Sequence, residues 1–274
     1  MVELLEKEAF YYWCNDHLIE PVHGAFFKEE KYQGYASHQE AVLAFLTYMN
    51  RVWSIGIPHL VPGLKEKLDQ VPRVEVTLSP EVEARIEAGA TAQAEADRKA
   101  EIKYLKDREK HIDYEKLQKR FEESKQELTK IRKEVRKDRE IAFKRFPQLY
   151  KLTNEVALVY TKDTSFEAYK GFPIRLNPEM MQGTEVASED FFAENGEYEL
   201  AFRSYLQVHR TKEDFQRVNQ LLFPEKEELV IYQWNTDFTN SYNGGRKDDG
   251  AYLWSIYDRK KQQFTVIDIE LIIP

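Results

Sequence analysis

Four carboxylate side chains late in the sequence have the types and spacing that best fit chemistry: Asp248, Asp249, Asp268 and Glu270. In a β-strand, Asp268 and Glu270 would share one face about 7 Å apart. An acidic residue followed by an acidic-x-acidic strand is typical of metal-dependent nucleases, where paired carboxylates hold a divalent cation. The pattern therefore makes Asp249, Asp268 and Glu270 candidate catalytic residues of a hydrolase.

Two features of the same stretch argue against that chemistry. Nuclease sites of this kind usually carry a lysine two residues after the last carboxylate, and Ile272 occupies that position. The glycines within residues 244–250 indicate a polar loop, and charged side chains mostly lie exposed. We therefore expect Asp268 and Glu270 to lie on a solvated face, and we predict no catalytic residue, no bound metal and no cofactor.

A second cluster contains the only cysteine, Cys14, together with His17, His23 and His38. These side chains are of the types that bind zinc, but their spacing matches no common zinc motif. Cys14 with a histidine would also make a nucleophile pair, although no third member is visible. We interpret the cluster as chance. One cysteine excludes an intrachain disulfide and a multi-cysteine metal site.

Composition and missing motifs narrow the function further. The sequence lacks the phosphate-binding glycine loop, the dinucleotide-binding fingerprint, the zinc-protease motif and the nucleophile elbow. The chain of 274 residues is 42% hydrophobic, which is enough for a packed core, and its net charge of −8 argues against a general polyanion binder. No apolar window approaches the length of a membrane span and no secretory signal is visible, so we expect a cytoplasmic protein.

The middle of the sequence predicts long helices. Ser79-Pro80-Glu81 is a good helix start, no proline follows until Pro147, and the interval is rich in strong helix formers. A heptad pattern breaks near residues 111–113, where Asp113 fits the cap of a second helix. We predict an antiparallel, coiled-coil-like hairpin over 79–147, with one long helix as the alternative. The heptad positions are Tyr114, Leu117, Phe121, Leu128, Ile131, Val135 and Ala142.

The flanking regions complete an α+β prediction with three parts. Residues 1–78 read as a helical N-terminal region, in which Ser37 and Glu40 fit a capping box. Residues 148–274 read as an α+β domain that ends in a β-hairpin. Its expected elements are strands over 155–161, 172–176 and 229–234, a helix capped by Thr211 and Asp214, and hairpin strands over 252–257 and 264–273.

The hairpin region also carries the clearest charge signal. Between Asp97 and Arg145 the sequence has 18 Lys and Arg against 12 Asp and Glu, a net of +6, so the rest of the chain carries −14. The basic stretch 130–145 fits a binding surface for a partner protein, and complementary charge speeds such encounters. Its candidate partner-binding residues are Lys130, Arg132, Lys133, Arg136, Lys137 and Arg139.

These observations favour a non-catalytic protein-interaction function, for which a toxin-neutralising or immunity-type protein is one concrete version. Two alternatives stay open. The basic helix 130–145 would also bind nucleic acid through its phosphates, and the C-terminal carboxylates would serve a metal-dependent hydrolase. Exposed heptad positions would further allow two copies of the chain to associate.

Overall fold

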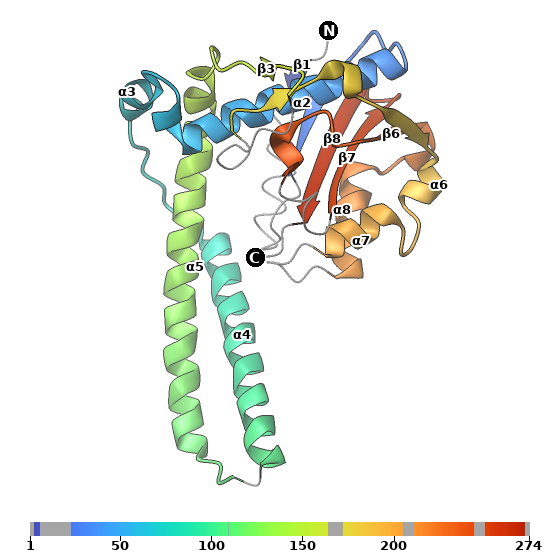
Figure 1. The fold of residues 1–274 in the computed structure, drawn as a ribbon. Helices are drawn as coiled ribbons and strands as arrows, with labels where there is room; N and C mark the ends of the chain where they lie inside the picture. Colours follow the sequence, from blue (N-terminus) through green and yellow to red (C-terminus); the bar gives the residue numbers. More distant parts are fainter. Residues whose placement is uncertain are drawn as a thin grey trace. The chain divides into compact units, whose positions relative to one another are not determined.

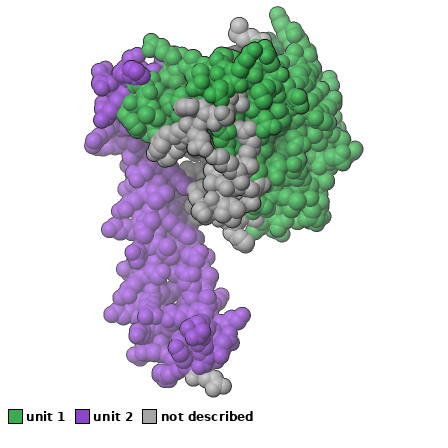
Figure 2. All heavy atoms as spheres, viewed as in Figure 1, with its two compact units in different colours: residues 1–61, 153–274 green, residues 62–152 purple. Residues whose placement is uncertain are grey.

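The computed structural model describes residues 3–5, 23–108, 110–163, 172–204, 211–243 and 250–271. The chain divides into two compact units (Figure 2). Residues 1–61 and 153–274 make up the first, here called the body, and residues 62–152 make up the second, here called the hairpin unit. No helix in the described part of the chain is long and apolar enough to cross a membrane.

The body is built on a six-stranded antiparallel sheet with the strand order β1-β2-β8-β7-β6-β5 (Figure 1). The strands are β1 (Glu3–Leu5), β2 (His23–Lys28), β5 (Gly183–Val186), β6 (Leu229–Trp234), β7 (Gly250–Asp258) and β8 (Gln263–Leu271). A separate parallel pair joins β3 (Val159–Tyr160) to β4 (Arg175–Leu176). The predicted C-terminal hairpin is confirmed, because β7 and β8 pair along their whole lengths.

Strict alternation along β7 and β8 gives the sheet two buried faces. Trp254 and Ile267 point to one face, and their neighbours Leu253 and Val266 point to the other. All four side chains are buried. A sheet with two apolar faces needs a layer of helices on each side.

Helices supply both layers. Helix α2 (Tyr35–Gly56) packs on one face through Val42, Phe45 and Leu46. The other face is covered by α6 (Ser188–Phe191), α7 (Glu197–Arg203) and α8 (Lys212–Leu222) (Figure 1). Four short 3-10 helices lie in the described connections: η1 (Pro58–Leu60), η2 (Pro178–Met180), η3 (Lys226–Glu228) and η4 (Asn240–Tyr242).

The N-terminal region differs from its prediction in two ways. Residues 23–28 form strand β2 and residues 3–5 form strand β1, whereas a helical unit was expected there. Helix α2 begins after Gly34, and Ser37 lies inside it, where its hydroxyl accepts a hydrogen bond from the Gln33 N–H at 2.9 Å. The predicted capping box is therefore wrong. The rest of the predicted helical region before residue 23 falls outside the described residues.

The hairpin unit contains α3 (Leu64–Asp69), α4 (Pro80–Asp107) and α5 (Tyr114–Lys151). The predicted helix starts are confirmed, since Ser79 Oγ accepts from the Val82 N–H and Asp113 Oδ1 accepts from the Lys116 N–H. The two long helices pack against each other as an antiparallel hairpin, not as one continuous helix (Figure 1). Helix α5 continues through Pro147, four residues beyond the predicted limit of 147.

Candidate functional site

The C-terminal carboxylates lie in a different environment from the one the sequence predicts. Asp268 is 4% exposed, so the solvated face expected for it is wrong. Its position on the central strand β8, between β2 and β7, explains the burial. Glu270 lies two residues further on the same strand and is half-buried. Asp249 lies outside the described residues, as does Asp248.

The partners of Asp268 come from distant parts of the sequence. His23 faces it from β2, with Nδ1 3.5 Å from Asp268 Oδ1. Tyr242 lies beside it, fully buried, and burial followed by the Asp268 charge raises the pKa of its phenol well above the ordinary value. Within the described ranges, no group of three or more His, Cys, Asp or Glu side chains is placed to hold a metal ion. The cluster thus joins a carboxylate, an imidazole and a phenol.

One of the three histidines grouped with Cys14 in the sequence, His38, is part of a buried hydrogen-bond network. His38 is fully buried, with Nδ1 2.8 Å from Ser255 Oγ and Nε2 3.0 Å from the Tyr32 hydroxyl. Trp234 Nε1 donates to the same Ser255 oxygen at 2.8 Å. Burial lowers the pKa of His38 to about 3, against the opposing effect of Ser255. A neutral, enclosed imidazole of this kind ties helix α2 to the sheet. Cys14 and His17 lie outside the described residues.

Several of the predicted partner-binding side chains interact within the hairpin unit. Lys133 Nζ lies 2.7 Å from Glu83 of α4 and lowers the pKa of that carboxyl. Arg136 Nε donates to Glu140 at 3.1 Å on the same helix. Arg132 lies so close to Gly89 that a Cβ there would be 2.8 Å from its Nη1. Lys133 and Arg132 therefore contact α4, whereas Arg136 pairs within α5.

The other three predicted residues, Lys130, Lys137 and Arg139, are exposed on α5. They flank two apolar side chains that the heptad pattern placed in the interior of the hairpin. Ile131 is 47% exposed and Val135 is 44% exposed. Together with Ala142, which is also exposed, they form a row at four- and seven-residue spacing, here called the α5 stripe.

The α5 stripe leaves the helix interface for a geometric reason. Leu117, near the start of α5, is buried against α4, and Phe121 and Leu128 are half-buried. A straight α-helix drifts about 20° per heptad relative to an exact seven-residue repeat. The heptad row that is buried or half-buried from Leu117 to Leu128 is therefore turned toward solvent at Ile131 and Val135.

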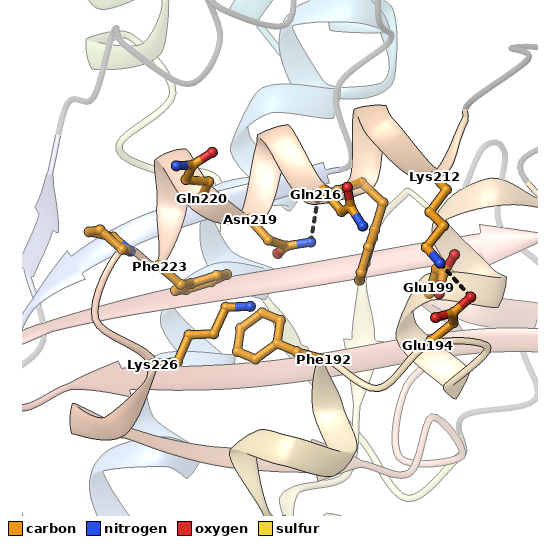
Figure 3. Close-up of a pocket in the computed structure, with 11 residues that line it drawn as sticks. Phe192, Glu194, Glu199, Lys212, Gln216, Asn219, Gln220, Phe223 and Lys226 are labelled. Atoms are coloured by element: carbon orange, nitrogen blue, oxygen red, sulfur yellow. Dashed lines mark hydrogen bonds and ion pairs between the residues drawn. The ribbon is translucent and has the colours of Figure 1, made fainter.

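A cavity in the body provides a further candidate site, which the sequence did not predict. It has a volume of about 370 Å³ and lies between α8, the segment after α6, and η3 (Figure 3). Asn219 is the buried amide in its wall. One sequence feature points to this site: a polar residue, Asn219, falls on the apolar side of α8 beside Phe215, Val218 and Leu222.

Comparisons of the chain with protein-family models, with curated proteins and with solved structures each find no match. The assignment of a function therefore rests on the physical features of the body and of the hairpin unit.

Proposed function

We propose that the protein is a non-catalytic binding protein, and that its hairpin unit binds an amphipathic helix of a partner protein. The observation that carries this proposal is the α5 stripe, in which Ile131 and Val135 expose apolar surface on a regular helix. An amphipathic helix would bury these side chains by packing alongside α5, as the third helix does in a three-helix coiled coil. Burying one such side chain fully contributes about 1.5–3 kcal/mol.

The charges around the α5 stripe define the chemistry of the partner. Residues 130–145 contain eight Lys and Arg and three Asp and Glu, and the exposed Lys130, Lys137 and Arg139 border the stripe. An acidic margin on the partner helix would complement these cations. A second copy of the same segment would bring like charges together, which disfavours self-association through this surface.

Site-specific photocrosslinking tests the proposal directly. A photoreactive residue at Val135 should yield one covalent adduct in native extract, and peptide mapping should place the crosslink in an acidic amphipathic helix. The matched control position is Gln126, which is exposed on α5 but not at three- or four-residue spacing from the α5 stripe. A crosslink from Gln126 equal to that from Val135, or an adduct removed by nuclease, would contradict the proposal.

Substitution of the α5 stripe gives the second arm of the test. The double change Ile131→Asp and Val135→Asp should weaken binding of the mapped partner peptide by at least about tenfold, because each aspartate removes an apolar contact that the bound partner helix would bury. Helicity measured by circular dichroism should be unchanged, because both side chains are exposed. Reversing Lys130 and Lys137 to Glu should produce a smaller loss that diminishes as salt is raised. Unaltered affinity in the double variant would exclude the stripe as the binding surface.

A further inference from the structure

The cavity on the α8 face of the sheet has the features of a binding site for a small molecule. Its volume of about 370 Å³ falls within the size range of ligand pockets and would accommodate a compound of about one ring. Three aromatic side chains form part of its wall, namely Phe192, Phe215 and Phe223. Phe215 and Phe223 are buried, so the floor of the cavity is fixed by the packed core.

The Asn219 side chain presents an unused acceptor in this cavity. The residue is 2% exposed, and its Nδ2 donates to the Phe215 carbonyl at 2.8 Å, which fixes the orientation of the amide. Its Oδ1 is buried and has no hydrogen-bond partner among the described residues. A buried carbonyl oxygen without a hydrogen-bond partner is uncommon and costs folding free energy, so a ligand that donates a hydrogen bond to this atom would gain affinity. Figure 3 shows the amide extending from α8 toward the space beside Phe223.

A cation lies at the same end of the cavity. Lys226 Nζ sits over the Phe192 ring, 4.2 Å from its centroid, and it makes no ion pair with a described residue. Figure 3 places this ammonium group between Phe223 and Phe192, on the side that Asn219 faces. The cavity therefore combines a positive charge, flat apolar walls and one buried acceptor.

The acidic residues of the wall are already neutralised by other groups. Glu199 accepts hydrogen bonds from the Asn195 N–H at 2.8 Å and from Arg203 Nη1 at 3.2 Å. Glu194 pairs with Lys212 at the far end of the cavity, and this pairing lowers the pKa of Glu194. An anionic ligand beside Lys226 would consequently meet little repulsion.

We propose that this cavity binds a small aromatic carboxylate that also carries a hydrogen-bond donor. The carboxylate pairs with Lys226 Nζ, the ring packs against Phe192 and Phe223, and the donor reaches Asn219 Oδ1. Each of the three ligand features complements one feature of the cavity. The site belongs to the body alone and is independent of the proposed partner helix.

Ligand-observed NMR on the full chain tests the proposal with four matched probes. These are 3- and 4-hydroxybenzoate, benzoate, which lacks the hydroxyl donor, and phenol, which lacks the carboxylate. At least one hydroxybenzoate should bind with a Kd on the order of 1 mM, as expected for about ten non-hydrogen atoms. Benzoate and phenol should each bind about tenfold more weakly, because each lacks one polar contact.

Two variants assign the contacts to residues. Lys226→Gln should remove the preference for hydroxybenzoate over phenol. Asn219→Leu should remove the preference for hydroxybenzoate over benzoate. Arg217→Gln is the control, since Arg217 is an exposed cation on α8 that does not line the cavity. No binding up to about 10 mM, which is weaker than ligands of this size usually reach, would overturn the proposal. Binding that is unchanged in both cavity variants, with the fold intact by circular dichroism, would overturn it equally.

Discussion

The two sides of the body's sheet bury the same side chain, asparagine, with opposite outcomes. On the α2 side, Asn50 Nδ2 donates to the Ala157 carbonyl and its Oδ1 accepts from the Ile174 N–H, both at 2.9 Å. Asn240 is satisfied in the same way by Pro173 and Arg175.

On the α8 side, Asn219 satisfies its donor and leaves its acceptor without a partner. All three residues are at most 2% exposed. The difference separates amides that hold the fold together from an amide that the fold leaves available to a ligand.

Replacing the satisfied amide should have the largest effect. Asn50→Leu leaves the buried backbone N–H of Ile174 unpaired and removes the hydrogen bond to the carbonyl of Ala157, a residue that is itself exposed. The unpaired N–H costs about 1–3 kcal/mol and the lost hydrogen bond about 0.5–1.5 kcal/mol, so we expect the free energy of unfolding to fall by about 2–4 kcal/mol. Urea denaturation monitored by tryptophan fluorescence measures the change. A loss below about 1 kcal/mol would show that these loop contacts contribute little to stability.

The His38 network should make the α2 side sensitive to acid. The folded protein lowers the pKa of His38 to about 3, whereas the imidazole of the unfolded chain titrates near its ordinary value of 6.5. The unfolded state therefore binds more protons below pH 6.5, and stability falls as the pH falls from 6.5 toward 3. The slope contributed by His38 should approach about 1.4 kcal/mol per pH unit near pH 5.

Denaturation curves from pH 8 to 5 measure this slope, and His38→Gln is the matched variant because its amide retains hydrogen-bonding capacity. The other five histidines are common to both proteins, so the difference in slope isolates His38. Parallel pH profiles of the two proteins would mean that His38 is not held neutral by the fold.

Replacing the unsatisfied amide should have the smallest effect, and of opposite sign. Asn219→Leu removes a buried acceptor without a partner and adds apolar contact with the core. We expect the free energy of unfolding to rise by up to about 1 kcal/mol. The same urea measurement applies, and a destabilisation as large as that of Asn50→Leu would erase the contrast between the two sides.

The elements that local sequence determines were predictable. Ser79, Asp113 and Thr211 start helices because each side chain caps backbone N–H groups within three residues of itself. Strand Leu229–Trp234 and the β7–β8 hairpin follow from β-branched and aromatic residues and their alternation.

The rest depended on contacts between distant segments. The burial of Asp268 depends on the pairing of β8 with β2 and β7, and no local pattern connects it to its neighbours His23 and Tyr242. The exposure of Ile131 and Val135 depends on how α5 crosses α4, and a heptad pattern alone does not specify that crossing. The cavity was not predicted from the sequence for the same reason, because Phe192, Asn219 and Lys226 come from three separate elements.

The pairing of β2 with β8 has a consequence for biosynthesis. Strand β2 (residues 23–28) pairs toward the centre of the sheet with β8 (residues 263–271), which is far away in the sequence. Helices α4 and α5, in contrast, are separated only by a short turn. Local contacts form faster than distant ones, and chains emerge from the ribosome N-terminal part first. The hairpin unit is therefore able to form during translation, whereas β2 has to stay unpaired on that side until β8 has been made. During that interval the apolar strand Ala25-Phe26-Phe27 would be a natural target for chaperones.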